Sequence, residues 1–79
     1  MLNKITMEET DIMQKDLTMR ECEVLYLAAD GKTNPEIAEV LCVSIHTVKA
    51  HICSIIEKLN ARGRTHAVVL GIKKGIIKL

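Results

Sequence analysis

SIHTVKAHICSIIEKL, residues Ser44 to Leu59, is the stretch of this sequence that decides the fold. Four apolar residues in it recur at the spacing that places them on one face of an α-helix: Val48, Ile52, Ile55 and Leu59. The opposite face is polar or small: His46, Ala50, Cys53 and Glu57. Lys49 lies at one edge of this outer face, and hydroxyl, imidazole and amino groups line the other. Such a helix can enter a DNA major groove, because short side chains allow it to approach base edges while cations reach phosphates.

The composition favours one small helical domain. Seventy-nine residues can bury a single modest core, and the one aromatic residue is Tyr26, so aliphatic residues must form that core. Their period of about 3.6 residues predicts an all-α fold. No Ser-His-Asp set or glycine-rich phosphate loop is visible in the sequence, so we expect neither an enzyme nor a cofactor.

The sequence also indicates a cytoplasmic protein. No apolar run reaches the length of a membrane span, and the N-terminus lacks the apolar region of a signal peptide, so no membrane contact is expected. The three cysteines form no C-x-x-C pair, which fits a reducing compartment. No metal is expected either, because the cysteines and histidines lack paired ligand spacing: Cys42, His46, His51, Cys53 and His66.

Charge is divided unevenly along the chain. The overall net charge is +1, but residues 1 to 43 carry −5 and residues 44 to 79 carry +6. A helix followed by a strongly basic half is the charge distribution expected for nucleic-acid binding. A solvated basic face without a partner is the alternative that charge alone leaves open.

Two capped helices are expected before Ser44. Thr18 and Glu21 have the spacing of a capping box that begins the first helix, and Gly31 supplies its stop. Thr33 and Glu36 have the same spacing at the start of a second helix, which ends near residue 41. A short helix, a tight turn and a longer helix capped by Ser44 predict a helix-turn-helix.

A fourth helix is expected from residue 64 or 65 to residue 74. Its apolar residues surround most of the circumference, so a second surface should cover those that the core does not: Ala67, Val68, Val69, Leu70 and Ile72. Gly71 predicts the close approach of another backbone. Residues 1–16 show only loose periodicity and are either a frayed helix or a flexible arm, which leaves residues 17–79 as the helix-turn-helix domain.

Three motifs resemble the LuxR/FixJ-type helix-turn-helix. They are LTMRECEVL (Leu17 to Leu25), GKTNPEIA (Gly31 to Ala38) and SIHTVKAH (Ser44 to His51). The pattern continues through Lys58, Leu59, Arg64 and Ala67, so that the resemblance covers residues 17 to 77. It implies an all-α four-helix bundle of the kind found in bacterial transcription regulators, either a small stand-alone protein of the spore-coat regulator type or the C-terminal domain of a response regulator. The sequence does not separate these two.

The resemblance also implies residue roles. The third helix would enter the major groove and face bases with His46, Lys49, Ala50 and Cys53. Phosphates would be contacted or approached by Asn34, Ser44, Thr47, His51, Lys58 and Arg64. The fourth helix would form the dimer contact through Val68, Val69, Ile72, Lys73 and Ile76. Many members of the family carry a serine where Gly63 stands, which leaves the start of the fourth helix with a weaker cap.

Two classes of function follow from these patterns. The first is a sequence-specific transcription regulator that binds double-stranded DNA as a homodimer. The second is a protein-interaction helix-turn-helix, similar to a sigma-factor region, that binds RNA polymerase or another regulator and contacts DNA weakly.

Overall fold

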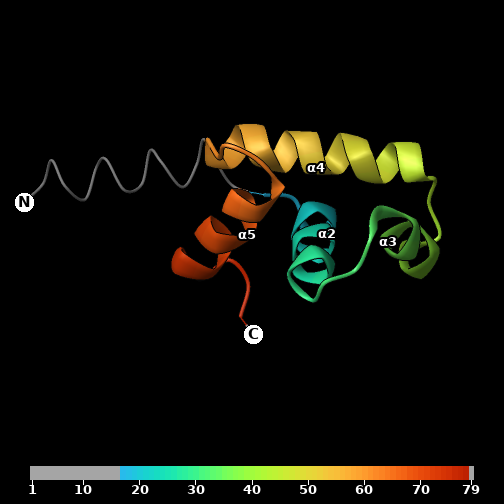
Figure 1. The fold of residues 1–79 in the computed structure, drawn as a ribbon, viewed down its shortest axis with the longest axis horizontal. Helices are drawn as coiled ribbons and strands as arrows, with labels where there is room; N and C mark the ends of the chain where they lie inside the picture. Colours follow the sequence, from blue (N-terminus) through green and yellow to red (C-terminus); the bar gives the residue numbers. More distant parts are fainter. Residues whose placement is uncertain (1–16, 79) are drawn as a thin grey trace, which may run out of the picture.

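The computed structural model describes residues 17 to 78, and the prediction for residues 1–16 lies outside this range. Within it the chain forms four helices and no strand: α2 (Met19–Ala29), α3 (Asn34–Leu41), α4 (Ile45–Leu59) and α5 (Arg64–Lys73). The longest helix, α4, lies along one side of the molecule, and the other three lie beneath it (Figure 1). The predicted all-α fold is confirmed.

The helices begin where their capping residues predict. Both reciprocal bonds of a capping box are present at Thr18, whose amide donates to Glu21 Oε1 at 2.9 Å. They are also present at Thr33, whose amide donates to Glu36 Oε1 at 2.8 Å. The Ser44 hydroxyl accepts a backbone amide from the first turn of α4 at 3.0 Å. These bonds satisfy N–H groups that have no partner within the helix.

Left-handed residues end the first three helices. Gly31 follows α2 with φ +88°, Cys42 ends α3 with φ +59°, and Asn60 ends α4 with φ +55°. After Cys42 the chain bends by 107° between α3 and α4, the angle expected of a helix-turn-helix. The fourth helix, α5, begins after Gly63 without a side-chain cap, as expected because glycine has no hydroxyl group to accept a backbone N–H.

One aliphatic core joins all four helices. Its buried members are Val24, Leu25, Ile37, Ala38, Val48, Ile55, Leu59, Ala67 and Ile77. The predicted stripe of α4 is therefore confirmed, with Ile52 partly buried beside it. Because α4 contacts each of the other three helices, its stripe is the surface on which the domain is assembled.

The close approach expected at Gly71 occurs, but the neighbour was predicted wrongly. A Cβ atom at this position would lie 2.7 Å from Leu25 Cδ2 and 3.4 Å from Ile77 Cγ1, so side chains of the core, and not another backbone, occupy the space. The helix α5 ends at Lys73, one residue before the predicted end.

No single helix in residues 17–78 is long and apolar enough to cross a membrane, and only the bent pair of α3 and α4 has the required length and composition.

Candidate nucleic-acid interface

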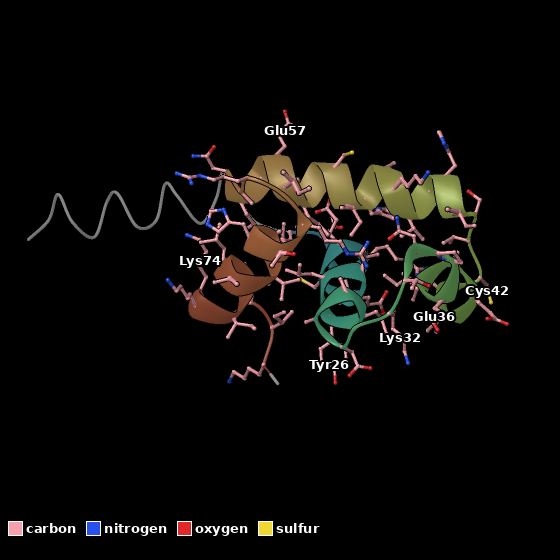
Figure 2. All side chains as sticks on the ribbon, in the orientation of Figure 1. Tyr26, Lys32, Glu36, Cys42, Glu57 and Lys74 are labelled. Atoms are coloured by element: carbon pink, nitrogen blue, oxygen red, sulfur yellow. The ribbon has the colours of Figure 1, made fainter. Side chains whose placement is uncertain are left out.

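The outer face of α4 is open to solvent. Its five residues are all exposed: His46, Lys49, Ala50, Cys53 and Glu57. Figure 2 shows Glu57 directed away from the other helices. Ala50 and Cys53 have short side chains, so the middle of the face offers little steric hindrance to a flat partner. The structure thus brings the four predicted base-contacting residues together on one surface.

The N-terminus of α4 lies beside this face. The hydroxyls of Ser44 and Thr47 share a hydrogen bond of 2.9 Å, and Ser44 is exposed while Thr47 is partly buried. His51, one turn further along the same edge, is also partly buried. A helix N-terminus carries partial positive charge from its unpaired N–H groups, which favours anions near it.

A buried carboxylate lies under the other half of α4. Glu21 is only 4% exposed, yet both of its oxygens are hydrogen-bonded. Ser54 Oγ donates to Oε2 at 2.6 Å, and Lys58 Nζ donates to Oε1 at 2.8 Å. Burial by itself raises the pKa of Glu21, but the bonds from Lys58, Ser54 and the Thr18 amide, with the Lys58 charge, outweigh it and lower the pKa to about 2 from the ordinary 4.5.

This cluster of Glu21, Ser54 and Lys58 fixes α4 to the start of α2. The sequence assigned Glu21 only a capping role, because its two partners on α4 lie 33 and 37 residues away. Ser54 and Lys58 lie one helical turn apart on the same edge of α4, but this spacing says nothing about the residue opposite them on another helix, so no local signal in the sequence indicates the cluster. Lys58, predicted to contact phosphate, therefore has a partner inside the domain, although its side chain remains 30% exposed.

A second contact joins the starts of α3 and α5. The Arg64 guanidinium donates to Asn34 Oδ1 and, at 2.8 Å, to the Lys32 carbonyl oxygen. Arg64 and Asn34 were both predicted to approach phosphates, and the structure brings them together. A guanidinium has five N–H donors, so these two bonds leave others that an anion can accept.

The outer side of α5 is apolar. Val69 is 40% and Ile72 41% exposed, and Lys73 beside them is exposed as well. Val68 and Ile76, which were assigned to the same dimer surface, are partly buried against the core. The exposed apolar area predicted for this helix is therefore concentrated at Val69 and Ile72.

Histidine and cysteine side chains do not gather in the part of the chain that the structure describes. No group of three or more His, Cys, Asp or Glu residues is placed to hold a metal ion there. One imidazole is already engaged, since His66 Nδ1 accepts the Arg62 amide at 3.0 Å.

Residues 15–70 match the model of the family described as bacterial regulatory proteins, luxR family. The chain belongs to the luxR family. It is 51% identical over 63 residues to the transcriptional regulatory protein DegU of Brevibacillus brevis, a match that covers 80% of this chain and 27% of DegU.

Two further relatives are similar to this chain over a comparable number of residues. The HTH-type quorum sensing-dependent transcriptional regulator RpaR of Rhodopseudomonas palustris is 46% identical over 68 residues, which cover 86% of this chain and 28% of RpaR. The transcriptional regulatory protein LiaR of Bacillus subtilis is 49% identical over 61 residues, which cover 77% of this chain and 29% of LiaR. The chain thus spans less than a third of the length of these curated relatives.

Membership of the luxR family confirms the resemblance seen in the three sequence motifs, and the four-helix fold agrees with it. The family match covers α2, α3 and α4 completely and most of α5. The exposed outer face of α4 therefore lies wholly within the part of the chain that matches the family.

Proposed function

We propose that this chain binds double-stranded DNA in a sequence-specific manner and regulates transcription, with α4 in the major groove. The observation that carries the proposal is the exposed outer face of α4, which combines small residues in its middle with cations and hydroxyls at its edges. The relatives DegU, RpaR and LiaR are described as transcriptional regulators, and their similarity to this chain supports the same class.

Lys49 is the main candidate for base readout. Its ammonium can donate to guanine O6 or N7, a contact that typically contributes ~1–3 kcal/mol of discrimination. His46 lies beside it and can donate or accept at a second base. The Ala50 methyl group forms no hydrogen bond and the Cys53 thiol is only a weak donor, so both suit close apolar contact with base edges, and DNA shape would contribute part of the specificity.

Phosphate contacts would surround this readout face. The proposed set is Asn34, Ser44, Thr47, His51, Lys58 and Arg64. The hydroxyls at the start of α4 and the free N–H groups of Arg64 are well suited to hold one strand, because they combine donors with positive potential. Lys58 would use the two N–H donors that Glu21 does not accept.

A homodimer would form through α5. Val69 and Ile72 supply the apolar centre, with Lys73, Val68 and Ile76 around them. Two copies related by a two-fold axis would present their α4 helices to half-sites about one helical turn, or ~34 Å, apart. Such a protein acts where the chromosome lies, so the proposal places it in the cytoplasm.

A mobility-shift selection tests the proposal. The chain is mixed with a pool of promoter fragments at two salt concentrations, and the bound duplexes are sequenced. Enrichment of a common motif at both concentrations is the expected result. Binding that falls with salt and enriches no motif would contradict the proposal and favour the protein-interaction helix-turn-helix instead, with RNA polymerase or another regulator as its partner.

A further inference from the structure

An isoleucine stands at the first position of α4. Ile45 is 43% exposed, although its side chain is branched and carries no polar atom. Its neighbours in the chain, Ser44 and His46, are exposed as well. The aliphatic core does not include Ile45, and the surface proposed for the dimer lies on α5. None of the roles assigned above therefore accounts for this side chain.

Ile45 lies on the same edge of α4 as Lys49, because the two residues are four positions apart. Ile56 occupies this edge three turns further on, where it is partly buried against the core. At the start of the helix the edge is open to solvent. Figure 1 shows this start above α3 and the far end of α4 above α5, so Ile45 is remote from the proposed dimer surface.

On the basis of the proposed DNA-binding function, we propose that Ile45 selects a thymine by packing against its C5 methyl group. Thymine presents this methyl group in the major groove, and apolar side chains recognise it by contact. The N-terminal residues of a recognition helix are the ones that approach base edges, and Ile45 is the first residue of α4. Its side chain also reaches further than the methyl group of Ala50.

The spacing of Ile45 and Lys49 places the thymine relative to the guanine that the lysine contacts. Four residues of an α-helix advance about 6 Å along its axis. Successive nucleotides of one strand are ~3.4 Å apart along the duplex. The selected operator should therefore carry a thymine one or two base pairs from that guanine.

A second kind of DNA contact is open to an isoleucine. It has no donor for a phosphate oxygen, but it can pack against a deoxyribose without regard to sequence. The two contacts differ in one respect, because only packing against the base depends on the thymine methyl group. Removing that methyl group from the DNA therefore separates them.

Deoxyuridine in place of thymidine makes this test, because the two bases differ only in the methyl group. Each thymidine of the selected operator is replaced in turn, and the Kd of the full chain is measured at fixed salt. We expect one replacement, next to the guanine, to raise the wild-type Kd about fourfold. This factor equals ~0.8 kcal/mol, the value for burying one hydrocarbon group of this size.

Three variants assign the effect to its side chain. Ile45→Ala should bind the thymidine and deoxyuridine operators equally, and alanine favours the helix, so α4 is retained. Ile45→Val keeps the branched carbon and should keep most of the preference. Val40→Ala is the matched control and should keep the full fourfold effect: Val40 is exposed, it lines the same hollow as Tyr26, and Figure 2 shows Tyr26 pointing away from α4.

Three results would overturn the role of Ile45. They are a wild type that responds to no deoxyuridine, a fourfold preference that persists in Ile45→Ala, and a selected motif without thymine within two base pairs of the guanine. The ratio of operator to random-duplex affinity tests the proposed function separately. Specific binding that ignores deoxyuridine overturns the role of Ile45 alone, whereas equal binding to operator and random duplex overturns both.

Discussion

Replacing Glu21 with Gln should destabilise the domain strongly at neutral pH. The pKa of Glu21 is lowered from 4.5 to about 2 in the folded chain, so the charged carboxylate stabilises the fold at every pH above 4.5. As the pH falls from 4.5 to about 2, this contribution is lost. The gap of about 2.5 pH units corresponds to ~3 kcal/mol. For a domain of this size, that is a fall in Tm of roughly 12–24 °C.

Urea unfolding followed by circular dichroism measures this effect. At pH 7 the variant Glu21→Gln should unfold at lower urea with an unchanged slope, and between pH 5 and pH 2 it should lose less stability than the wild type. The matched control is Glu23→Gln on the same helix, whose ion pair with Arg20 is half exposed and should contribute less than about 1 kcal/mol. Equal stability of Glu21→Gln and wild type at pH 7 would refute the reasoning.

The carboxylate of Glu36 also makes the stability of the fold depend on pH in the acid range. Hydrogen bonds from the amide and hydroxyl of Thr33 lower the pKa of Glu36, so its contribution is also lost as the pH falls through the folded-state value. The Glu21→Gln variant therefore keeps a residual acid sensitivity, which the additional substitution Glu36→Gln should reduce further.

Three further substitutions test other parts of the structure. Gly71→Ala should destabilise the domain by ~1–3 kcal/mol in urea unfolding, because the new methyl group would lie 2.7 Å from Cδ2 of the buried Leu25. A variant more stable than the wild type would show that the Leu25 side chain can move aside without loss of packing. Lys58→Ala should reduce stability by ~1.5–3 kcal/mol through the loss of its bond to Glu21, and should lower the salt slope of DNA binding by ~1 if the same ammonium reaches a phosphate. A loss of stability with an unchanged salt slope would show that Lys58 bonds to Glu21 but does not contact a phosphate. Ile72→Glu should shift sedimentation toward the monomer and weaken binding to a two-half-site operator, and an unaltered oligomeric state would remove α5 from the dimer contact.

The starts and ends of the helices could be predicted because their signals are local. The capping boxes at Thr18 and Thr33 and the Ser44 cap each act within three residues, and the stripe of α4 is a periodicity within one helix. The exposed face opposite that stripe follows from the same geometry. For this reason the candidate base-contacting residues were found together on one surface.

The contacts that the sequence did not reveal all join distant residues. Glu21 carries the same local pattern as Glu36, yet the structure buries one and leaves the other exposed, because only Glu21 lies beneath α4. Arg64 and Asn34 are 30 residues apart, so nothing local indicates their bond. The neighbour of Gly71 was misjudged for the same reason, since a glycine pattern shows that space is needed but not which group fills it.

The central claim, that α4 reads bases through Lys49, is tested most directly by one comparison of affinities. Lys49→Ala and the control Lys78→Ala, which removes an exposed lysine outside α4, are each titrated against the selected operator and a random duplex at fixed salt. We predict that Lys49→Ala weakens operator binding by ~1–3 kcal/mol more than random binding, while Lys78→Ala affects both duplexes equally. An equal loss on both duplexes for Lys49→Ala would contradict the account.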